Sequence, residues 1–383
     1  MKKKIRLFKP LIGREELQSI AGVFSDSWLG LGKKTEEFEK KFSKKFKVKY
    51  SVATNSGTSA LNLAIKCLNL PKGKSVMVNN MTFVSSATCI LSNDLKPIFI
   101  DCDKKNLAFD LNDAKKKFTK NVVAILVVHY GGYAANMKDI ISFANTKKIK
   151  VIEDCAHSQG GTYNQKTLGS LGDIGCFSFE EKKGMTTGDG GMLVTNNRKI
   201  YNLAKKIRWL GIDKSTWERN KIRSQKFKHW KYKIDLLGDK WHMNDLSAAI
   251  GIAQLKKLDF INRKKKEIVK EYRKNIQTSH QVQFLIEDFN DEHVYWLFGL
   301  KTSRRDSCID YLEKKGISTG VHHIPLTKFN LFKNYKNNQK NSTNLYNQIL
   351  TLPLHASMSK KDVIFISKTV NEFFTIQSKN YRN

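Results

Sequence analysis

The sequence has no apolar run that approaches the ~20 residues needed to cross a bilayer as a helix. Its first residues are basic, but the apolar segment that follows such residues in a secretory signal peptide is missing. Hydrophobic residues still make up 40% of the chain, which argues against a disordered protein. These features predict a globular, cytoplasmic protein without a membrane partner.

Cysteine patterns of the kinds that hold metals or form redox centres are also missing. The chain has six cysteines, and none belongs to a CxxC pair or to a metal-ligand spacing. In a long chain without a signal sequence, such cysteines are expected to be reduced residues of the core. The sequence therefore predicts no disulfide and no metal site.

Acidic residues are scarce. The 35 acidic residues face 68 basic ones, which gives a net charge of +33. One interpretation is a lysine-rich composition, and the other is a polyanionic partner such as nucleic acid. The lysines are scattered along the chain rather than gathered in one arm or helix, which favours composition and no nucleic-acid partner. A diffuse positive field would still attract a small phosphorylated substrate.

Short apolar runs alternate with helical patterns over the first half of the chain. We expect strands at 50–53, 75–78, 97–101, 122–128, 150–153, 175–179 and 191–195, and helices at 14–25, 35–46, 58–69, 82–92, 111–118 and 137–147. Strands that alternate with helices in this way predict an α/β fold with a mostly parallel central sheet.

The remainder of the chain has a different pattern. Residues 213–235 are polar, basic and aromatic and predict an irregular excursion. A helix is expected from Asn244, its N-cap, through Leu258, and a strand at 292–300. A length of 383 residues suggests about two domains. We place the boundary near residue 246, between a large domain (1–246) and a smaller C-terminal domain (247–383).

Ligands of open α/β sheets bind beyond the carboxyl ends of the strands, so the residues that follow each strand are the first candidates for a site. Residues 54–61 form a turn rich in Gly, Ser and Thr that opens a helix and contains Gly57, Thr58 and Ser59. The free N–H groups and the positive end of the helix dipole suit a phosphate there. Alone, the turn fits a simple helix cap equally well.

Two further residues follow strand ends. Phe83 could lie flat on a cofactor ring, although a single aromatic residue is more often part of the core. Asp154 ends a buried strand, where it could cap a loop or make a charge-assisted hydrogen bond to a cationic ring nitrogen.

The densest group of polar residues lies at 177–191, between two apolar strands. It contains Ser178, the pair Lys182 and Lys183, and a Thr/Gly-rich turn. Burial lowers the pKa of a lysine amine and makes it a nucleophile. A phosphate turn, an aromatic platform, an acid for a ring nitrogen and a lysine for an aldehyde together match the requirements of pyridoxal 5′-phosphate (PLP).

An ordered set of motifs over nearly the whole chain resembles the DegT/DnrJ/StrS family of PLP-dependent nucleotide-sugar aminotransferases. The motifs lie at residues 10–13, 27–32, 55–61, 127–132, 152–157, 172–179, 237–245, 248–255, 316–317, 321–325 and 352–355. The resemblance implies the fold type I of the aspartate aminotransferase superfamily, with a smaller C-terminal α+β domain. It also implies a homodimer with shared active sites.

The resemblance assigns roles to particular residues. Lys183 matches the Schiff-base lysine, five residues before the turn at 188–191, and Asp154 matches the partner of the pyridine nitrogen. The other implied cofactor-binding residues are Gly57, Thr58, Ser59 and Ser178 at the phosphate, Phe83 on the ring, His157 beside the ring hydroxyl, and Lys240, which would reach the partner subunit's phosphate. The implied substrate-binding residues are Trp28, His322 and His323.

Some positions depart from the family pattern. Glu180, Asp189 and the pair Trp241 and His242 replace more typical residues, and Lys240 stands where many members have Asn. A cation at position 240 still suits a phosphate. The departures preserve the cofactor chemistry and leave the substrate open.

The implied reaction is a ping-pong transamination from an amino acid, glutamate most often in the family, to a nucleotide-linked keto sugar. Lys183 would act as the general base and acid. The residues at 238–243 resemble 4-amino-sugar enzymes, which favours C4 of a 4-keto-6-deoxy sugar, and surface polysaccharide or lipopolysaccharide is the expected destination. Lys214, Arg223 and Lys228 are candidates for the diphosphate.

Two alternatives remain. Some relatives are PLP-dependent sugar dehydratases, but those replace the Schiff-base lysine with His, and this chain has Lys183. A basic nucleic-acid-binding or regulatory protein is supported by the net charge alone.

Overall fold

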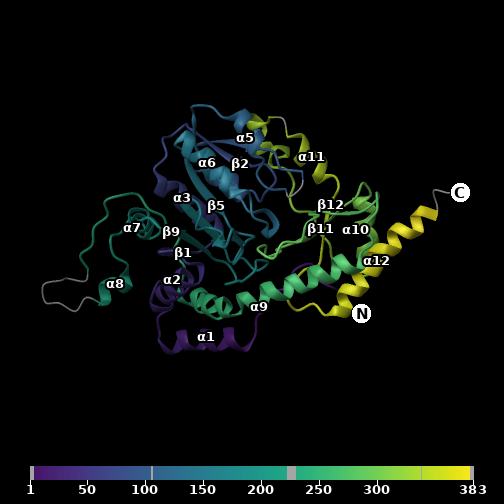
Figure 1. Ribbon diagram of the computed structural model, residues 1–383. Coiled ribbons are helices and arrows are strands. Elements are labelled where there is room, and N and C mark those ends of the chain that lie inside the picture. Colours follow the sequence, from purple (N-terminus) through teal and green to yellow (C-terminus); the bar gives the residue numbers. More distant parts are fainter. Residues whose placement is uncertain (1–3, 105–106, 222–229, 338, 380–383) are drawn as a thin grey trace.

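A computed structural model describes residues 4–104, 107–221, 230–337 and 339–379. Its centre is a seven-stranded sheet with the strand order β1-β9-β8-β5-β4-β2-β3 (Figure 1). The strands are β1 (Tyr50–Thr54), β2 (Ser75–Asn79), β3 (Lys96–Ile100), β4 (Val122–Val128), β5 (Lys150–Asp154), β8 (Ile174–Ser178) and β9 (Gly191–Thr195). β9 pairs antiparallel with β1 and with β8, and the pairs among β8, β5, β4, β2 and β3 are parallel. The predicted α/β fold with a mostly parallel sheet is confirmed.

Helices cover both faces of this sheet because its strands are apolar on both sides. In β2, Val76 and Val78 pack into the core under α3 (Gly57–Leu68), whereas Met77 packs on the opposite side. The first face also carries α4 (Ser85–Leu91) and α7 (Arg198–Ile207). The second carries α2 (Lys33–Phe46), α5 (Leu111–Lys117), α6 (Met137–Lys147) and the start of α9 (Asp245–Asn275). α1 (Arg14–Ser25) packs on α9.

The C-terminal part has its own small sheet, in the order β10 (Gln283–Phe284), β11 (Phe298–Lys301) and β12 (Ile349–Leu352). Around it lie α10 (Arg305–Lys314), α11 (Lys340–Tyr346) and α12 (Lys360–Lys379). The structure also contains a short hairpin of β6 (Thr162–Tyr163) and β7 (Lys166–Thr167), and the helix α8 (Thr216–Lys221). The division into domains at residue 246 stays a prediction, since that residue falls in the first turn of a continuous helix.

That helix, α9, corrects one expectation. Asn244 caps it as predicted, because its side chain accepts the N–H of Ser247 at 2.8 Å. The helix does not end near Leu258 but continues to Asn275, running from below the large sheet to the small one (Figure 1).

The expected strand at 292–300 is also shorter, since β11 begins only at Phe298. The apolar residues before it are buried against other segments, and their backbone bonds to the loop after β4. The N–H of Trp296 donates to the carbonyl of Gly131 at 2.8 Å, and that of Val294 to Gly132 at 3.3 Å.

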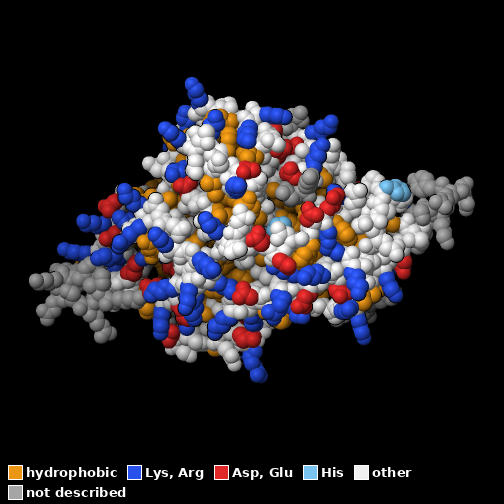
Figure 2. Space-filling model, in the orientation of Figure 1, with side chains coloured by type: hydrophobic (Ala, Val, Ile, Leu, Met, Phe, Trp, Pro, Cys, Tyr) orange, Lys and Arg blue, Asp and Glu red, His pale blue; other side chains and the backbone are white. Residues whose placement is uncertain are grey.

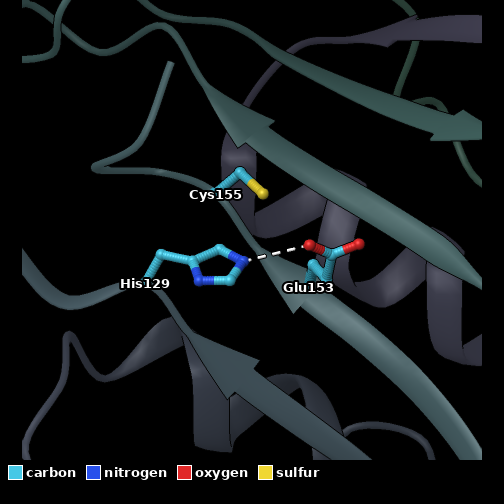
Figure 3. A group of neighbouring side chains, drawn as sticks. All are labelled: His129, Glu153 and Cys155. Atoms are coloured by element: carbon cyan, nitrogen blue, oxygen red, sulfur yellow. Dashed lines mark hydrogen bonds and ion pairs between the residues drawn. The ribbon is translucent and has the colours of Figure 1, made fainter. Parts of the chain in front are cut away.

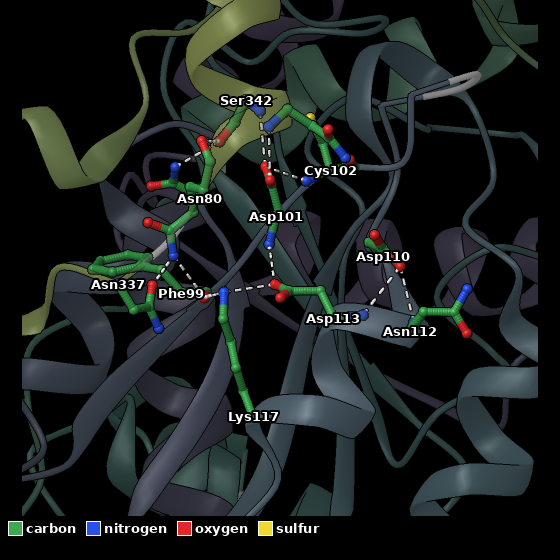
Figure 4. Close-up of polar contacts among 12 residues, drawn as sticks. Asn80, Phe99, Asp101, Cys102, Asp110, Asn112, Asp113, Lys117, Asn337 and Ser342 are labelled. Atoms are coloured by element: carbon green, nitrogen blue, oxygen red, sulfur yellow. Dashed lines mark hydrogen bonds and ion pairs between the residues drawn. The ribbon is translucent and has the colours of Figure 1, made fainter.

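A polar network ties the C-terminal segment to the large sheet (Figure 4). The Asp101 carboxylate, just after β3, accepts the N–H groups of Asn341 and Ser342 at 2.8 Å each, at the start of α11. The Asn80 side chain, just after β2, donates to the Ser342 hydroxyl at 2.8 Å. Asn80 also accepts the N–H of Thr327 at 3.1 Å, so the segment that follows His322 and His323 is anchored at the strand ends.

The six cysteines are buried and unpaired, as expected. Across the described residues, no helix is both long enough and apolar enough to cross a membrane.

Candidate active site

The site lies at the carboxyl edge of the large sheet. β5 ends there at Asp154 and β8 at Ser178, and β9 starts at Gly191 directly opposite Ser178. A cavity of ≈ 490 Å³ opens at this edge. The predicted site residues that line it are Gly57, Thr58, Phe83, Asp154, His157, Ser178, Lys183, His322 and His323.

One end of the cavity is formed by the first turn of α3. The N-cap Ser56 accepts the N–H of Ser59 at 3.0 Å, and the Thr58 hydroxyl lies 2.7 Å from that of Ser85. Gly57 packs so closely on β8 that a Cβ there would lie 2.6 Å from the Cβ of Ser178. This approach places the helix N-terminus beside the hydroxyls of Thr58 and Ser178. Such a cradle fits a phosphate.

Asp154 lies at the floor of the cavity. Its carboxylate accepts the Ser86 hydroxyl at 2.8 Å and the N–H of Ala156 at 3.1 Å. Burial raises the pKa of this carboxyl, and the Ser86 hydrogen bond and the nearby charge of Lys183 act in the opposite direction. A buried acid held in this way fits a protonated ring nitrogen, because the two charges stabilise each other.

Lys183 is on the loop between β8 and β9 and faces the same cavity. Burial lowers the pKa of its amine, and the carboxylates of Glu180 and Asp154 oppose that effect. Its Nζ lies 4.8 Å from the ring centroid of Trp296. A lowered pKa increases the fraction of neutral amine, which is the form that attacks an aldehyde or accepts a proton.

His157 stacks on Trp296, with ring centroids 3.7 Å apart and an interplanar angle of 2°. Its Nδ1 accepts the N–H of Gly131 at 3.4 Å, so its proton is on Nε2. Burial lowers the pKa of the imidazole well below its usual range and keeps it neutral. His157 therefore offers an N–H donor to a ring oxygen.

Phe83, His322 and His323 form the outer wall of the cavity. Phe83 is 57% exposed, and its ring centroid lies 6.2 Å from that of His323. The His322 carbonyl accepts the Tyr130 hydroxyl, and its Nδ1 lies 3.1 Å from the Thr351 hydroxyl. Burial lowers the pKa of His322 to about 4 and that of His323 well below its usual range, so both imidazoles are neutral at pH 7. Among the described residues, His323 Nε2 has no hydrogen-bond partner.

Residues 10–371 match the DegT/DnrJ/EryC1/StrS aminotransferase family. The chain belongs to this family. Over 377 residues it is 34% identical to the spore coat polysaccharide biosynthesis protein SpsC of Bacillus subtilis, covering 95% of both chains. Over 381 residues it is 31% identical to the UDP-4-amino-4,6-dideoxy-N-acetyl-beta-L-altrosamine transaminase of Campylobacter jejuni, covering 97% of both.

The fold agrees with these sequence relatives. The Helicobacter pylori aminotransferase PseC, of pseudoaminic acid biosynthesis, superposes with a TM-score of 0.91. The match covers 97% of this chain and 100% of that one at 22% identity, so it bears on the fold alone. The protein is thus an enzyme, a PLP-dependent sugar aminotransferase of fold type I. The phosphate cradle, Asp154, His157 and Lys183 fit that cofactor.

Three predicted site residues of this aminotransferase lie outside the cavity. The Ser59 hydroxyl donates to Asn55 at 2.6 Å and is used within the α3 cap. Trp28 packs on Trp217, with ring centroids 5.2 Å apart, beside a second cavity of ≈ 470 Å³ that Trp217 lines. Lys240 is exposed, and its carbonyl accepts the Asn55 side chain at 3.4 Å. The cofactor and substrate roles of these three residues stay predictions.

Of the three expected diphosphate cations, the described residues test only Lys214. Lys214 does not line the cavity, and Arg223 and Lys228 lie outside the described residues.

Sequence reasoning missed three residues that shape the site. Ser86 binds Asp154, and Trp296 contacts both Lys183 and His157. The buried Gln159 side chain donates to the Ser178 carbonyl and accepts the N–H of Met185 at 2.6 Å, and so spans the lysine loop. Ser86 and Trp296 lie in segments that looked like ordinary helix and strand. Gln159 follows the motif at 152–157 by two residues, which was a usable signal.

A cluster of His129, Glu153 and Cys155 lies at the end of β5, close to the site (Figure 3). Glu153 precedes Asp154 in β5, so its side chain points to the opposite face of the sheet. Its carboxylate accepts His129 Nε2 at 3.0 Å and the N–H groups of Gly169, Leu171 and Gly172 at 2.7–2.8 Å. Because these bonds already satisfy the carboxylate, the cluster is explained as a structural support of the β5 end.

Proposed function

We propose that the enzyme transfers the amino group of glutamate to C4 of a 4-keto-6-deoxy sugar linked to a nucleoside diphosphate, for a surface polysaccharide. The observation that carries this proposal is the convergence of Lys183, Asp154 and the Gly57–Ser178 cradle on one cavity of ≈ 490 Å³. The choice of C4 is supported by the pattern at 238–243 and by the relative named as a 4-amino-sugar transaminase. The relative named for spore coat polysaccharide supports the destination.

The chain's own residues supply binding, orientation and proton transfer. The first turn of α3 and the hydroxyls of Thr58 and Ser178 hold the phosphate, and Asp154 keeps a proton on the ring nitrogen. When bound, PLP supplies a ring that accepts the negative charge developing at the substrate carbon. Lys183 Nζ removes the proton from the donor's amino-bearing carbon and later delivers one to the sugar carbon.

The outer wall provides the contacts for the sugar. His322 and His323 are neutral and face the cavity, so they can bind sugar hydroxyls without repelling or attracting charge. Glu180 and Asp189 also line the cavity and can accept hydrogen bonds from hydroxyls. The +33 net charge favours the approach of a diphosphate.

We also propose that the enzyme is a homodimer in which Trp28 and Lys240 complete the partner's active site. Both residues lie outside the cavity of their own subunit. From that position they could perform their predicted roles only in the cavity of a partner subunit. The exposed apolar side chains of Trp230, Ile234 and Leu237, in and just after the 213–235 excursion, are suited to burial between subunits.

The test is an absorbance spectrum of the purified protein with PLP, for the native chain and for Lys183→Ala, before and after glutamate. We expect a lysine–cofactor band in the native chain that glutamate removes, and no such band in Lys183→Ala. The same protein is then offered UDP-, GDP- and dTDP-linked 4-keto-6-deoxy sugars, and the aminated carbon is located by NMR. A band that persists in Lys183→Ala would sink the lysine assignment, and amination at C3 would sink the choice of C4.

A further inference from the structure

Trp296 connects three parts of the active site that come from different places in the chain. It precedes β11 in the C-terminal part and is 3% exposed. Its indole N–H donates to the Lys182 carbonyl at 2.8 Å, and its own backbone N–H donates to the Gly131 carbonyl at 2.8 Å. One residue thus joins the lysine loop, through its side chain, to the loop after β4, through its backbone.

The indole ring also has three close neighbours. His157 stacks on it at 3.7 Å, and Phe8 stacks on it with ring centroids 5.2 Å apart. Lys183 Nζ lies over the ring at 4.8 Å from its centroid. An ammonium over an indole face is stabilised by the ring quadrupole, most strongly where water is excluded.

We propose that Trp296 is a positioning residue of this active site. It fixes the Lys183 amine and the His157 ring relative to each other, and it stabilises the protonated amine. The inference rests on the proposed role of Lys183. The N–H bond fixes the backbone next to Lys183, so the amine reaches the substrate carbon from a constant position. The stack fixes His157, whose Nε2–H then points into the cavity.

Two opposing influences therefore act on the Lys183 amine. Burial favours the neutral form, and Glu180, Asp154 and the Trp296 face favour the ammonium, while Lys182 repels it. A base that must both accept and deliver a proton works best when neither form dominates. By stabilising the ammonium, Trp296 would bring the neutral and charged forms of the Lys183 amine closer to equal amounts.

The test uses Trp296→Phe, which keeps a ring face and loses the N–H, and Trp296→Leu, which loses both. Trp209→Phe is the matched control, because the Trp209 Nε1–H has no hydrogen-bond partner among the described residues. The apoenzymes are labelled with trace acetic anhydride between pH 6 and 10, and acetylation of Lys183 is quantified by peptide mass spectrometry. Thermal unfolding verifies that each variant is folded.

We expect the labelling midpoint of Lys183 to move to lower pH in Trp296→Phe and further in Trp296→Leu. Below the native midpoint, the leucine variant should label about fivefold to tenfold faster. In the loaded enzymes, kcat should fall by about tenfold in the leucine variant, with the KM for the amino donor within about twofold. The Trp209→Phe profile should superimpose on the native one.

Profiles of both Trp296 variants that superimpose on the native profile, or midpoints that move to higher pH, would overturn the proposal. So would an equal shift in the Trp209→Phe control. Because the labelling needs neither cofactor nor substrate, it reports on Trp296 even if the spectrum of Lys183→Ala shows that another lysine carries the cofactor.

Discussion

At the scale of single residues, the site depends on charged groups whose protonation is set by burial. Asp154 must be ionised to hold a protonated ring nitrogen, yet burial raises the pKa of its carboxyl. The hydroxyl of Ser86 compensates in part, because a hydrogen bond to the carboxylate favours the charged form. A residue of α4 that carries no recognisable motif therefore supports the acid at the end of β5.

We predict that Ser86→Ala raises the pKa of Asp154 further. Cofactor affinity should be lost as pH falls through that pKa, so the loss should begin at higher pH in the variant. The measurement is the dissociation constant of PLP from the apoenzyme between pH 4 and 8. Thr88→Ala, on the same helix, serves as the control, and identical pH profiles for all three proteins would contradict the prediction.

Lys265 of α9 gives a second pH-dependent prediction. It is 5% exposed, and burial lowers the pKa of its amine from 10.5 to about 8. The folded state therefore binds fewer protons than the unfolded state between these values, so burial of Lys265 destabilises the protein below pH 8 and ceases to do so as pH approaches 10.5. The difference corresponds to roughly 3 kcal/mol.

Lys265→Met should accordingly be more stable than the native enzyme at pH 7 by up to about 3 kcal/mol, and the gain should shrink between pH 8 and 10.5. Denaturant unfolding at several pH values measures it. Lys264→Met, at a more exposed neighbouring position, should show little change. A gain that is independent of pH would mean that the lysine costs stability through packing rather than charge.

At the scale of elements, the phosphate cradle depends on how closely α3 approaches β8. A Cβ at position 57 would lie 2.6 Å from that of Ser178, so Gly57→Ala must push the helix away from the strand. We expect a loss of about 1–3 kcal/mol in unfolding free energy and weaker PLP binding. The paired change Gly57→Ala with Ser178→Gly should restore stability but not PLP affinity, since the Ser178 hydroxyl is lost. If the paired change restores neither stability nor PLP affinity, the close approach of α3 to β8 is not the cause of the losses in Gly57→Ala.

Two elements, α9 and β11, have other bounds than their sequence patterns predicted. The prediction for α9 ended at Leu258 because the following residues are rich in lysine, which hides the apolar spacing. The buried residues Ile261, Lys265, Ile268 and Tyr272 continue the same helix face, with a lysine in an apolar position. In the segment before β11, an apolar run predicted a longer strand, but tertiary burial made it the irregular support that presents Trp296.

At the scale of the whole molecule, the positive charge is spread over the visible surface (Figure 2). Figure 2 shows Lys and Arg spread over the visible face with Asp and Glu between them, rather than gathered in one patch. That distribution agrees with a lysine-rich composition and with a general attraction for anionic substrates.

The proposed dimer gives a prediction for mixed subunits. If Lys240 serves the partner's site, Lys183→Ala and Lys240→Ala subunits should complement each other, because each mixed dimer has one site with both residues intact. Denaturing and refolding the two inactive variants together should restore about a quarter of the native activity. No restored activity, with mixed dimers shown to form, would place Lys240 in its own subunit's site or outside the chemistry.

The sequence by itself determined the α/β class, most strand and helix positions, and the candidate site residues at the strand ends. These follow from local periodicity, and from the rule that parallel strands bring their carboxyl ends to one edge. Tertiary structure alone decided the partners that tune those residues: Ser86 beside Asp154, Gln159 across the lysine loop and Trp296 beneath Lys183. These contacts join distant segments of the chain, as the 114 positions between Lys182 and Trp296 show, and local sequence patterns do not predict which distant side chain fills a given space. The motifs identify the candidate reacting groups, whereas tertiary packing determines the protonation state and the orientation of their side chains.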